Sequence, residues 1–481
     1  MITKSPNWLM QRARLTPDKI AIETNNRNIT FKQLFEKSLI LSNYFSNHNI
    51  KKHTHVAVFM KNSIEIIEVI FALHNLGAVI VFLNNRLTND ELTWQIKNSD
   101  CEFLISDVNI SFDDINILLS SDFPITINNS TEIQNEFIYE DTATIMFTSG
   151  TTGKPKGVMQ TYGNHYHSAI LSALNLGLHS NDKWLLNLPI FHISGYSTLI
   201  KSVIYGMTIV LPENNDSKTI VEAIQKHKVT LVSFVAKVLS DILHVDGDLT
   251  SVRAVLLGGG PASSSLLKSA ADRGLHVYLS YGMTETASQV VTLTPDSISQ
   301  KQGSGGRPLF LNSLKIIEDG SIENGYKTGE ILVKGPTVMK GYYKNPVATE
   351  AAFEGEWLKT GDIGYIDNEG FLYVLDRRKD LIISGGENIY PAEIEAVIGS
   401  HPEVIEVGVT GIRDDKWGQV PVAFYVSNSG DDVDLEIFCK ERLAKYKVPK
   451  RYIKVNKLPR NATGKLKRHE LINYLIKDNL C

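Results

Sequence analysis

Cysteine is scarce in this sequence. Only Cys101, Cys439 and Cys481 occur among 481 residues, and no two of them form a Cys-x-x-Cys pair. They are too few and too scattered to build a disulfide framework. The sequence therefore predicts a protein of a reducing compartment.

Long apolar runs and an excess of one charge are also missing. The longest apolar stretch, residues 69–83, is interrupted by His74 and Asn75 and is too short to cross a bilayer. The first residues contain no apolar segment of the kind a secretory signal has. The balance of 49 basic and 53 acidic residues leaves a net charge of −4, which argues against nucleic acid as a partner. We expect a cytoplasmic protein that binds neither membranes nor nucleic acid. The sequence does not fix the oligomeric state, and a homo-oligomer is possible.

What the sequence does contain is an alternation of strands and helices. Residues 54–60 read as a buried strand, residues 62–76 as a helix and residues 77–84 as a second strand. Short β-branched or aromatic runs recur at 231–235, 254–260 and 276–282, with a helical stretch between the last two. Such alternation is typical of a mostly parallel sheet covered by helices.

The pattern changes after about residue 300. Residues 314–335 read as hairpin-rich β structure with turn signals at Asp319–Gly320 and Asn324–Gly325. A charged stretch near Asp376 precedes a further strand, helix and strand. The sequence thus predicts an α/β fold. It has a large N-terminal domain, residues 1–376, with mostly parallel sheets and a small β subdomain, and a small α+β C-terminal domain, residues 377–481.

The strongest chemical signal is a loop that follows the apolar run ATIMF. It is rich in glycine, hydroxyl groups and lysine, and its backbone N–H groups can surround phosphate oxygens. A Walker A loop is excluded because Pro155 follows the lysine where Ser or Thr is required. The alternative is an ordinary surface loop. The residues concerned are Thr148, Ser149, Gly150, Thr151, Thr152, Gly153, Lys154 and Lys156.

Further motifs follow in a fixed order. They are Tyr281-Gly-Met-Thr-Glu-Thr286, Thr360-Gly-Asp362, Asp376-Arg-Arg-Lys-Asp380, Ser384-Gly-Gly-Glu-Asn388 and Asn461-Ala-Thr-Gly-Lys465. With the loop, this set resembles the signatures of the adenylate-forming superfamily, which includes acyl-CoA synthetases, peptide-synthetase adenylation domains and beetle luciferases. The resemblance spans residues 148–468. It implies a C-terminal domain that is mobile between two orientations.

The resemblance assigns roles to the second signature. Thr284 would hold the α-phosphate of ATP, and Glu285 would bind Mg²⁺, a hard cation that prefers few protein ligands plus phosphate oxygens. Tyr281 and Gly282 would lie at the adenine, and Gly258 and Gly259 would let the backbone approach the base. The alternative for this segment is a strand-end turn with a solvated glutamate.

The later motifs receive roles in the same way. Asp362 and Arg377 would bind the ribose, although an Asx turn and a solvated basic linker are the competing interpretations. Gly385 and Gly386 would line the pantetheine tunnel. Lys465 would stabilise the charge that develops when a carboxylate attacks the α-phosphate.

These roles imply one reaction. An acid attacks ATP to give an acyl-AMP and pyrophosphate, and the thiol of coenzyme A then displaces AMP. The cofactors would be ATP, Mg²⁺ and coenzyme A. The basic stretch 440–468, with 12 basic residues and one acid, could meet the CoA phosphates or be a solvated face.

The resemblance implies that residues 188–206 and residues near the Tyr281-Gly-Met-Thr-Glu segment line the pocket for the acid. In the family His192 stands at an aromatic gate beside the reacting carboxylate; a buried structural histidine is the alternative. Lys201 lies in an otherwise apolar helical stretch, where it would suit a substrate with a second carboxylate or face solvent. Ser194 and Thr198 are possible polar partners.

Three segments, LPIFHISG, LLGGGPA and SYGMTETASQ, resemble one branch of the superfamily most closely. That branch acts on o-succinylbenzoate in menaquinone biosynthesis, a small-molecule acid with one aliphatic and one aromatic carboxylate. The alternatives are a fatty-acyl or aryl-acid CoA ligase and, outside the enzymes, a nucleotide-binding regulator. A peptide-synthetase domain is less consistent because no carrier domain follows.

Overall fold

A computed structural model describes residues 3–126, 131–148, 155–259, 262, 264–376, 381–427, 434–459, 466 and 468–477. Contacts within the chain divide it into two compact units. The first comprises Met1–Asn85, Ile96–Met146 and Gly157–Leu375, and the second comprises Arg86–Gln95, Phe147–Lys156 and Asp376–Cys481. None of the helices in the described part of the chain combines the length and the apolarity that a membrane span needs.

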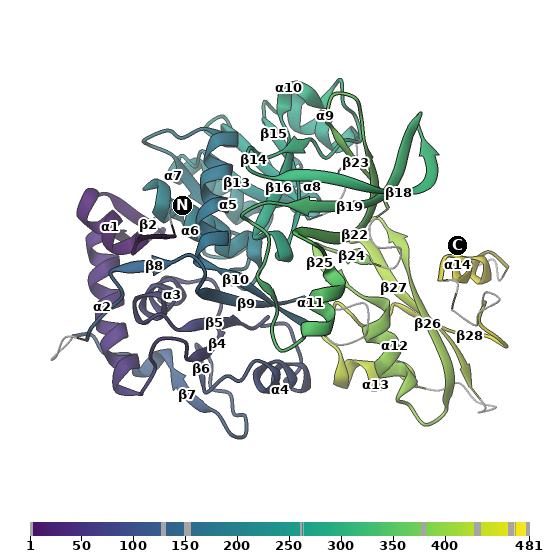
Figure 1. Ribbon diagram of the computed structural model, residues 1–481, viewed down its shortest axis with the longest axis horizontal. Helices are drawn as coiled ribbons and strands as arrows, with labels where there is room; N and C mark the ends of the chain where they lie inside the picture. Colours follow the sequence, from purple (N-terminus) through teal and green to yellow (C-terminus); the bar gives the residue numbers. More distant parts are fainter. Residues whose placement is uncertain are drawn as a thin grey trace. The chain divides into compact units, whose positions relative to one another are not determined.

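A seven-stranded sheet contains the first predicted βαβ unit (Figure 1). The pairs from β9 through β5, β4 and β6 to β7 are parallel, and β20 joins β10 antiparallel at one edge. The strands in spatial order are β20 (Gly341–Tyr342), β10 (Lys156–Thr161), β9 (Thr142–Thr148), β5 (Val79–Phe82), β4 (His55–Phe59), β6 (Phe103–Ser106) and β7 (Asn116–Leu119).

A nine-stranded sheet contains the second group of predicted strands. Its centre, from β15 to β2, is parallel, and antiparallel strands close both edges. The strands in order are β17 (Arg307–Pro308), β16 (Ser288–Leu293), β15 (Val277–Met283), β14 (Ala254–Gly258), β13 (Leu231–Val235), β11 (Lys183–Leu185), β12 (Thr208–Val210), β2 (Ile20–Glu23) and β3 (Asn28–Thr30). The expectation of mostly parallel sheets is confirmed.

Two helices are buried on nearly all sides. Every residue of α3 (Ile64–Leu76) from Ile66 onward is buried, as is every residue of α6 (Ile193–Tyr205) from Gly195 to Val203. Both pack in a core cluster that also takes apolar residues from strands of both sheets. Burial on nearly all sides is expected for a helix at the centre of a large domain, and the polar side chains within these two buried stretches are buried as well. Other helices of the first unit are α1 (Trp8–Leu15), α2 (Phe31–Asn47), α5 (Tyr162–Leu176), α7 (Ser217–His227), α8 (Ala236–Leu243), α9 (Ser264–Asp272) and α10 (Pro295–Ile298). The α4 helix (Asn89–Asn98) begins in the segment Arg86–Gln95, which belongs to the second unit.

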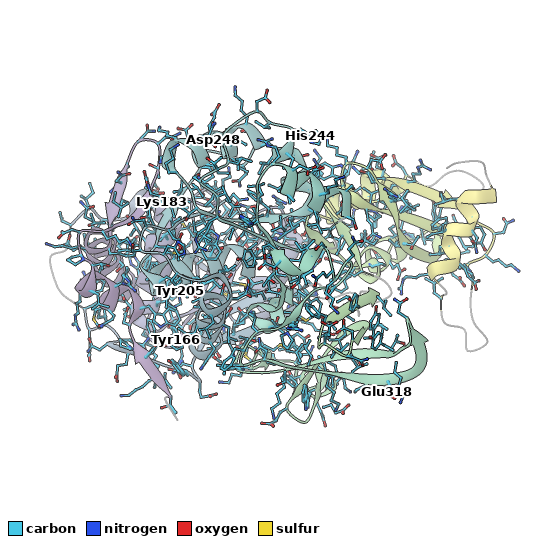
Figure 2. The ribbon with its side chains drawn as sticks, turned by 90° about the horizontal axis from the view of Figure 1, so that it is seen from above. Tyr166, Lys183, Tyr205, His244, Asp248 and Glu318 are labelled. Atoms are coloured by element: carbon cyan, nitrogen blue, oxygen red, sulfur yellow. The ribbon has the colours of Figure 1, made fainter. Side chains whose placement is uncertain are left out.

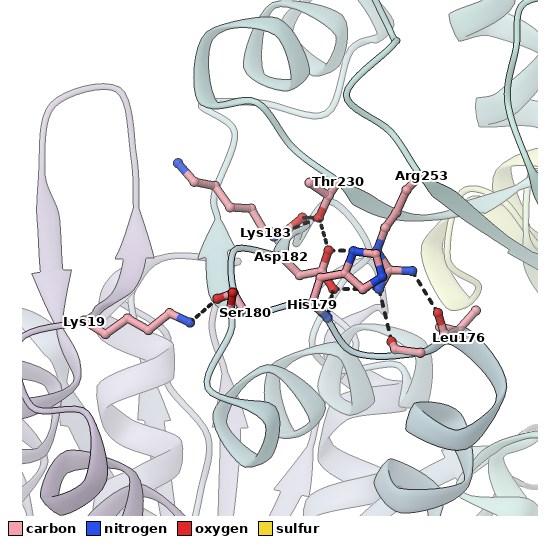
Figure 3. A network of polar contacts seen from close by, with 9 residues as sticks. Lys19, Leu176, His179, Ser180, Asp182, Lys183, Thr230 and Arg253 are labelled. Atoms are coloured by element: carbon pink, nitrogen blue, oxygen red, sulfur yellow. Dashed lines mark hydrogen bonds and ion pairs between the residues drawn. The ribbon is translucent and has the colours of Figure 1, made fainter.

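A buried ion pair fastens the amino ends of three neighbouring parallel strands (Figure 3). Asp182 precedes β11, Thr230 precedes β13 and Arg253 precedes β14. The Arg253 guanidinium donates to both oxygens of Asp182, at 2.8 and 2.6 Å, and the Thr230 hydroxyl donates to Oδ1 at 2.8 Å. This ion pair lies at the amino ends of the strands, whereas open α/β sheets bind ligands at the carboxyl ends.

The small β subdomain is present, with one correction. The turn predicted at Asn324–Gly325 joins β18 (Ser313–Glu323) to β19 (Tyr326–Lys334), and both residues have positive φ, at 50° and 82°. The turn predicted at Asp319–Gly320 is wrong. That pair lies inside β18, where the pairing with β19 shifts register between Glu318 and Ile322. A two-residue hairpin requires positive φ at both positions, which Asn-Gly adopts readily.

Four further elements complete this subdomain: β22 (Trp357–Ile366), β21 (Phe353–Glu354), β23 (Leu372–Asp376) and α11 (Pro346–Ala352). A separate two-stranded sheet pairs β1 (Lys4–Pro6) with β8 (Glu136–Ile138). Short 3-10 helices span Ser120–Asp122 and Thr284–Thr286.

The second unit has its own sheet and core. The sheet contains β25 (Glu387–Ile389), β24 (Ile382–Ser384), β27 (Gly418–Ser427), β26 (Val404–Asp414) and β28 (Arg451–Lys454). The helices α12 (Pro391–Gly399) and α13 (Leu435–Arg442) supply apolar residues to its core, and α14 (Arg468–Lys477) packs in a second cluster. The α12 helix starts at Pro391, a residue type that suits the first position of a helix.

Candidate active site

Two glycines lie where β14 ends, next to β15. A Cβ atom on Gly258 would approach the Ser280 Oγ to 2.7 Å, and Gly259 has φ +80°. The Ser280 hydroxyl donates to the Leu257 carbonyl at 3.1 Å, which holds the two strands together at this point. Both glycines therefore sit at the carboxyl end of parallel strands, the edge at which ligand crevices form.

Tyr281 and Asp362 are joined directly. The Tyr281 hydroxyl donates to Asp362 Oδ2 at 2.8 Å, and the two side chains are 3% and 4% exposed. Asp362 lies within β22 rather than in a turn, at a point where the pairing with β19 shifts register and Gly361 has φ 75°. The Thr360 hydroxyl accepts a hydrogen bond from the Asp362 N–H at 3.1 Å. The structure thus brings the second and third sequence motifs together and orients the carboxylate.

Glu285 is buried and held by a tyrosine. The Tyr342 hydroxyl donates to Glu285 Oε1 at 3.0 Å, and the Glu285 carbonyl accepts the Met339 N–H at 2.8 Å. The Gln160 amide donates to the carbonyl of the neighbouring Thr284. Among the described residues no cluster of three or more His, Cys, Asp or Glu side chains could hold a metal ion. A single oriented carboxylate fits Mg²⁺, which takes most of its ligands from phosphate and water.

The chain turns sharply after Glu285. Ala287 and Ser288 both have positive φ, at 50° and 101°. A Cβ on Gly282 would lie 2.1 Å from the Ser288 carbonyl oxygen, so only glycine fits opposite this turn. The Ser168 hydroxyl of α5 donates to the Ala287 carbonyl at 2.6 Å. Backbone strain of this kind persists only where the surroundings impose it, and it gathers at functional sites.

The α6 helix carries the residues expected to meet the acid. His192 is the N-cap residue of α6, half-buried, with its ring 4.6 Å from that of Phe191. The Ser194 carbonyl accepts hydrogen bonds from Ser197 at 3.2 Å and Thr198 at 3.0 Å. The Thr198 hydroxyl is therefore engaged within the helix.

Lys201 does not face solvent. Its side chain is 2% exposed, so the alternative of a lysine on the solvent side of α6 is wrong. Among the described residues no side chain or carbonyl bonds to its ammonium, and burial alone lowers the pKa of Lys201 to about 7. A buried ammonium without an anion is costly unless a ligand supplies one.

The far end of α6 is fixed by contacts from two other elements. Arg12 of α1 donates from Nε to the Val203 carbonyl at 3.0 Å and also binds the Ile204 carbonyl. A guanidinium at a helix C-terminus is favourable for the helix dipole. The hydroxyl of Tyr205, which is labelled in Figure 2, donates to the Ala169 carbonyl of α5.

Other predicted residues fall in the second unit or outside the described chain. Thr148 ends β9 and Lys156 begins β10. Gly385 and Gly386 form the turn between β24 and β25 with φ of 57° and 88°, and a Cβ on Gly385 would meet the Trp417 ring at 2.8 Å. The residues of the loop from 149 to 154, namely Ser149, Gly150, Thr151, Thr152, Gly153 and Lys154, lie outside the described residues, as do Arg377 and Lys465.

The basic stretch 440–468 contains one buried lysine. Lys447 is 4% exposed, and its ammonium lies 2.7 Å from Glu91 Oε1 and 2.6 Å from Glu393 Oε1. This lysine is part of the framework of its unit, so it belongs neither to a solvated face nor to a free polyphosphate site.

Sequence reasoning missed the residues that orient the site. Tyr342 and Gln160 hold Glu285 and Thr284, but they stand 57 and 124 positions away from their partners. No local pattern marks such residues. Tyr342 follows a glycine in β20, at the edge of the seven-stranded sheet, and the sequence gives no further signal for it.

The α/β fold, with its sequence motifs gathered at the carboxyl ends of parallel strands, is that of a nucleotide-binding enzyme. The chain belongs to the AMP-binding enzyme family: the family model matches residues 9–343, and the model of its C-terminal domain matches residues 393–465.

Several of its relatives are ligases of 2-succinylbenzoate. A 2-succinylbenzoate–CoA ligase of Bacillus cereus is 50% identical over 97% of this chain and 98% of its own length. A double mutant of the o-succinylbenzoate CoA synthetase of Bacillus subtilis, solved with the product analogue OSB-NCoA, is 46% identical with a TM-score of 0.94, covering 98% of this chain and 99% of that one. The same synthetase has been solved with its acyl-adenylate intermediate OSB-AMP; that structure is 47% identical, covers 98% of both chains and has a TM-score of 0.77. It has also been solved with ATP and magnesium; that structure is 46% identical, covers 98% of this chain and 100% of that one, and has a TM-score of 0.77.

Proposed function

We infer that this protein is an AMP-forming acid–CoA ligase that converts 2-succinylbenzoate to 2-succinylbenzoyl-CoA, with ATP, Mg²⁺ and coenzyme A, in menaquinone biosynthesis. The full-length similarity to ligases of this one acid supports the reaction. The observation that carries the choice of acid is Lys201, a buried ammonium on α6 without an anionic partner among the described residues.

In the first step the aliphatic carboxylate attacks the α-phosphate, a new C–O–P link forms, and pyrophosphate leaves. Asp362, oriented by Tyr281, accepts hydrogen bonds from the ribose hydroxyls. Thr284 contacts the α-phosphate, and Glu285 holds Mg²⁺, which neutralises phosphate charge. We propose that Lys465 and the loop from Thr148 to Lys156 complete this site, because preorganised cations stabilise the charge that develops during attack.

In the second step the thiol of coenzyme A attacks the acyl carbon. The thioester bond forms as the bond to AMP breaks, and the thiol proton goes to solvent. Gly385 and Gly386 are suited to line the pantetheine path because neither has a side chain. No protein nucleophile is needed for either step. The division into residues 1–376 for substrate binding and 377–481 for the catalytic lysine remains part of this proposal, as do a cytoplasmic location and the open oligomeric state.

Lys201 selects the acid by charge. The second carboxylate of 2-succinylbenzoate supplies the anion that the buried ammonium lacks. A fatty-acyl chain would bury the same ammonium against hydrocarbon, which is unfavourable. His192, at the N-terminus of α6, stands at the other end of the helix, where the reacting carboxylate would lie.

The test is pyrophosphate release by the purified protein with ATP, Mg²⁺ and coenzyme A. The acids compared are 2-succinylbenzoate, benzoate, coumarate and fatty acids of several lengths. A preference of at least 100-fold in kcat/KM for 2-succinylbenzoate is expected, since a site that pairs a buried charge discriminates strongly against acids that lack its partner. Turnover with monocarboxylic acids alone would contradict the proposed acid, and no pyrophosphate with any acid would favour a nucleotide-binding regulator.

A further inference from the structure

Gln289 has a buried carboxamide side chain at the start of β16. It is the second residue of β16 and is 3% exposed. Among the described residues, neither its Nε2 nor its Oε1 has a hydrogen-bond partner. Leaving both polar atoms of a buried amide unsatisfied is destabilising, and native proteins rarely do so. A ligand that bonds to the carboxamide would remove this cost.

Gln289 stands directly beside the second signature motif. In the pairing of β15 with β16 it lies opposite Gly282. The two residues before it, Ala287 and Ser288, have the positive φ values described above. The Thr286 hydroxyl donates to the Ser288 carbonyl at 2.9 Å, so the strained turn is fixed from the side of the motif. A held turn of this kind presents the next side chain in a defined place.

The start of β16 also touches α6. The Ser197 hydroxyl of α6 donates to the Ser288 hydroxyl at 3.4 Å, and α6 and β16 are contacting elements. Lys201 follows Ser197 by four residues and therefore lies on the same face of α6, one turn farther along. The Lys201 ammonium on α6 and the Gln289 carboxamide on β16, both without a partner among the described residues, therefore belong to two elements that contact each other.

The two groups together specify a chemistry. Lys201 offers a positive charge, and Gln289 offers two N–H donors and one acceptor. A carboxylate satisfies the ammonium and the amide N–H groups at once, whereas a hydrocarbon tail satisfies neither. We propose that Gln289 is a specificity-determining residue that, with Lys201, binds the second carboxylate of the acid. This inference rests on the proposed function and gives a role to Gln289, the last residue of the segment SYGMTETASQ.

The experiment compares two acids that differ only at the remote group. These are 2-succinylbenzoate and 4-oxo-4-phenylbutanoate, which lacks the ring carboxylate. For Gln289→Met we expect kcat/KM for 2-succinylbenzoate to fall about 10- to 100-fold, the loss typical of a hydrogen bond to a charged group, and kcat/KM for the analogue to change less than about threefold. For Gln289→Glu we expect a larger loss with 2-succinylbenzoate, because the added carboxylate repels the one in the substrate.

Two controls make the result decisive. Gln134→Met removes a carboxamide whose Nε2 already donates to the His74 carbonyl at 3.2 Å, and it should leave the ratio between the two acids unchanged. The double variant Gln289→Met with Lys201→Met should lose less than the product of the two single losses, since both remove contacts to one group.

An equal loss with both acids in Gln289→Met would show a structural role and overturn the inference. Should that variant not fold, the ratio measured for the nearly isosteric Gln289→Glu decides in the same way. Failure of the proposed function is seen separately, because the unmodified protein would then not turn over 2-succinylbenzoate at all.

Discussion

The Tyr281 hydroxyl donates to Asp362 Oδ2 at 2.8 Å, although the two residues are 81 positions apart in the chain. This bond joins β15 of the nine-stranded sheet to β22 of the β subdomain and fixes the carboxylate that would meet the ribose. In Tyr281→Phe, Asp362 loses a buried donor. We expect KM for ATP to rise about 10- to 100-fold, corresponding to ~1.5–3 kcal/mol for a hydrogen bond to a charged group.

Steady-state kinetics with varied ATP measures this effect. Tyr365→Phe is a matched control, because Tyr365 is also buried but its hydroxyl accepts a hydrogen bond from Asn324 instead. An unchanged KM for ATP in Tyr281→Phe would show that ATP binding does not depend on the hydrogen bond from Tyr281 to Asp362.

Tyr342 and Glu285 give a prediction about the metal. Removing the Tyr342 hydroxyl frees the Glu285 carboxylate, so Tyr342→Phe should require about 10-fold more Mg²⁺ for half-maximal rate, as expected when a group that orients a metal ligand is lost. The adjacent Tyr343→Phe is the control, since the Tyr343 hydroxyl donates to Asp100. A magnesium titration at saturating ATP reads the difference, and identical titrations for the two variants would contradict the assignment of Glu285.

Lys201 predicts a pH dependence whose sign follows from its pKa. Burial lowers the pKa of Lys201 from 10.5 to about 7, so the ammonium is charged below that pH and neutral above it. For the dicarboxylic acid, kcat/KM should therefore decline above pH 7, and Lys201→Arg should flatten the decline because arginine stays charged. A profile that is the same in both proteins would mean that Lys201 does not contact the acid.

The same residue predicts a stability effect. Because the folded protein binds the Lys201 proton less tightly than the unfolded chain does, charging Lys201 opposes folding below pH 7, and this opposition is relieved as pH rises from about 7 toward 10.5. Lys201→Met should raise Tm without ligand, and more at pH 6 than at pH 10. Thermal unfolding at the two pH values decides the question; a lower Tm at pH 6 would contradict it.

The Asp182–Arg253 pair predicts a loss of stability without a loss of specificity. Asp182 is 2% exposed, and although burial raises its pKa, hydrogen bonds from Arg253 and its neighbours hold the pKa below its usual value. Arg253→Met leaves that buried carboxylate without its counter-ion and should cost about 3–5 kcal/mol in the free energy of unfolding. Lys19→Met, which removes an exposed bond to the Ser180 carbonyl and a weaker charge interaction with Asp182, should cost far less.

Urea unfolding at pH 7 compares the two variants. The cost of Arg253→Met should shrink as pH falls into the range where Asp182 is protonated, because a neutral carboxyl needs no counter-ion. An equal effect of the two substitutions would mean that the strand ends are held by other contacts.

Much of the fold was readable from the sequence because its signals are local. The apolar spacing of α3 and the β-branched runs at β13 and β14 each lie within one element, and those elements are confirmed. The family and the ligase class implied by the motifs are confirmed by full-length relatives. The turn at Asp319–Gly320 failed because an irregular strand and a turn use the same residue types.

The site was only partly readable. Sequence motifs mark Tyr281, Glu285 and Asp362, because each stands in a short characteristic segment. The residues that orient them come from other elements. The burial of Lys201 depends on what packs around α6, which the sequence of that helix does not show, so only the structure separates the two interpretations of this lysine. The roles of the predicted site residues remain predictions, Lys465 included.

The most direct measurement is the product of one reaction. The purified protein is incubated with 2-succinylbenzoate, ATP, Mg²⁺ and coenzyme A, and mass spectrometry with nucleotide analysis follows the products. The account predicts 2-succinylbenzoyl-CoA, AMP and pyrophosphate in equal amounts. Formation of ADP, or AMP without any CoA thioester, would contradict it.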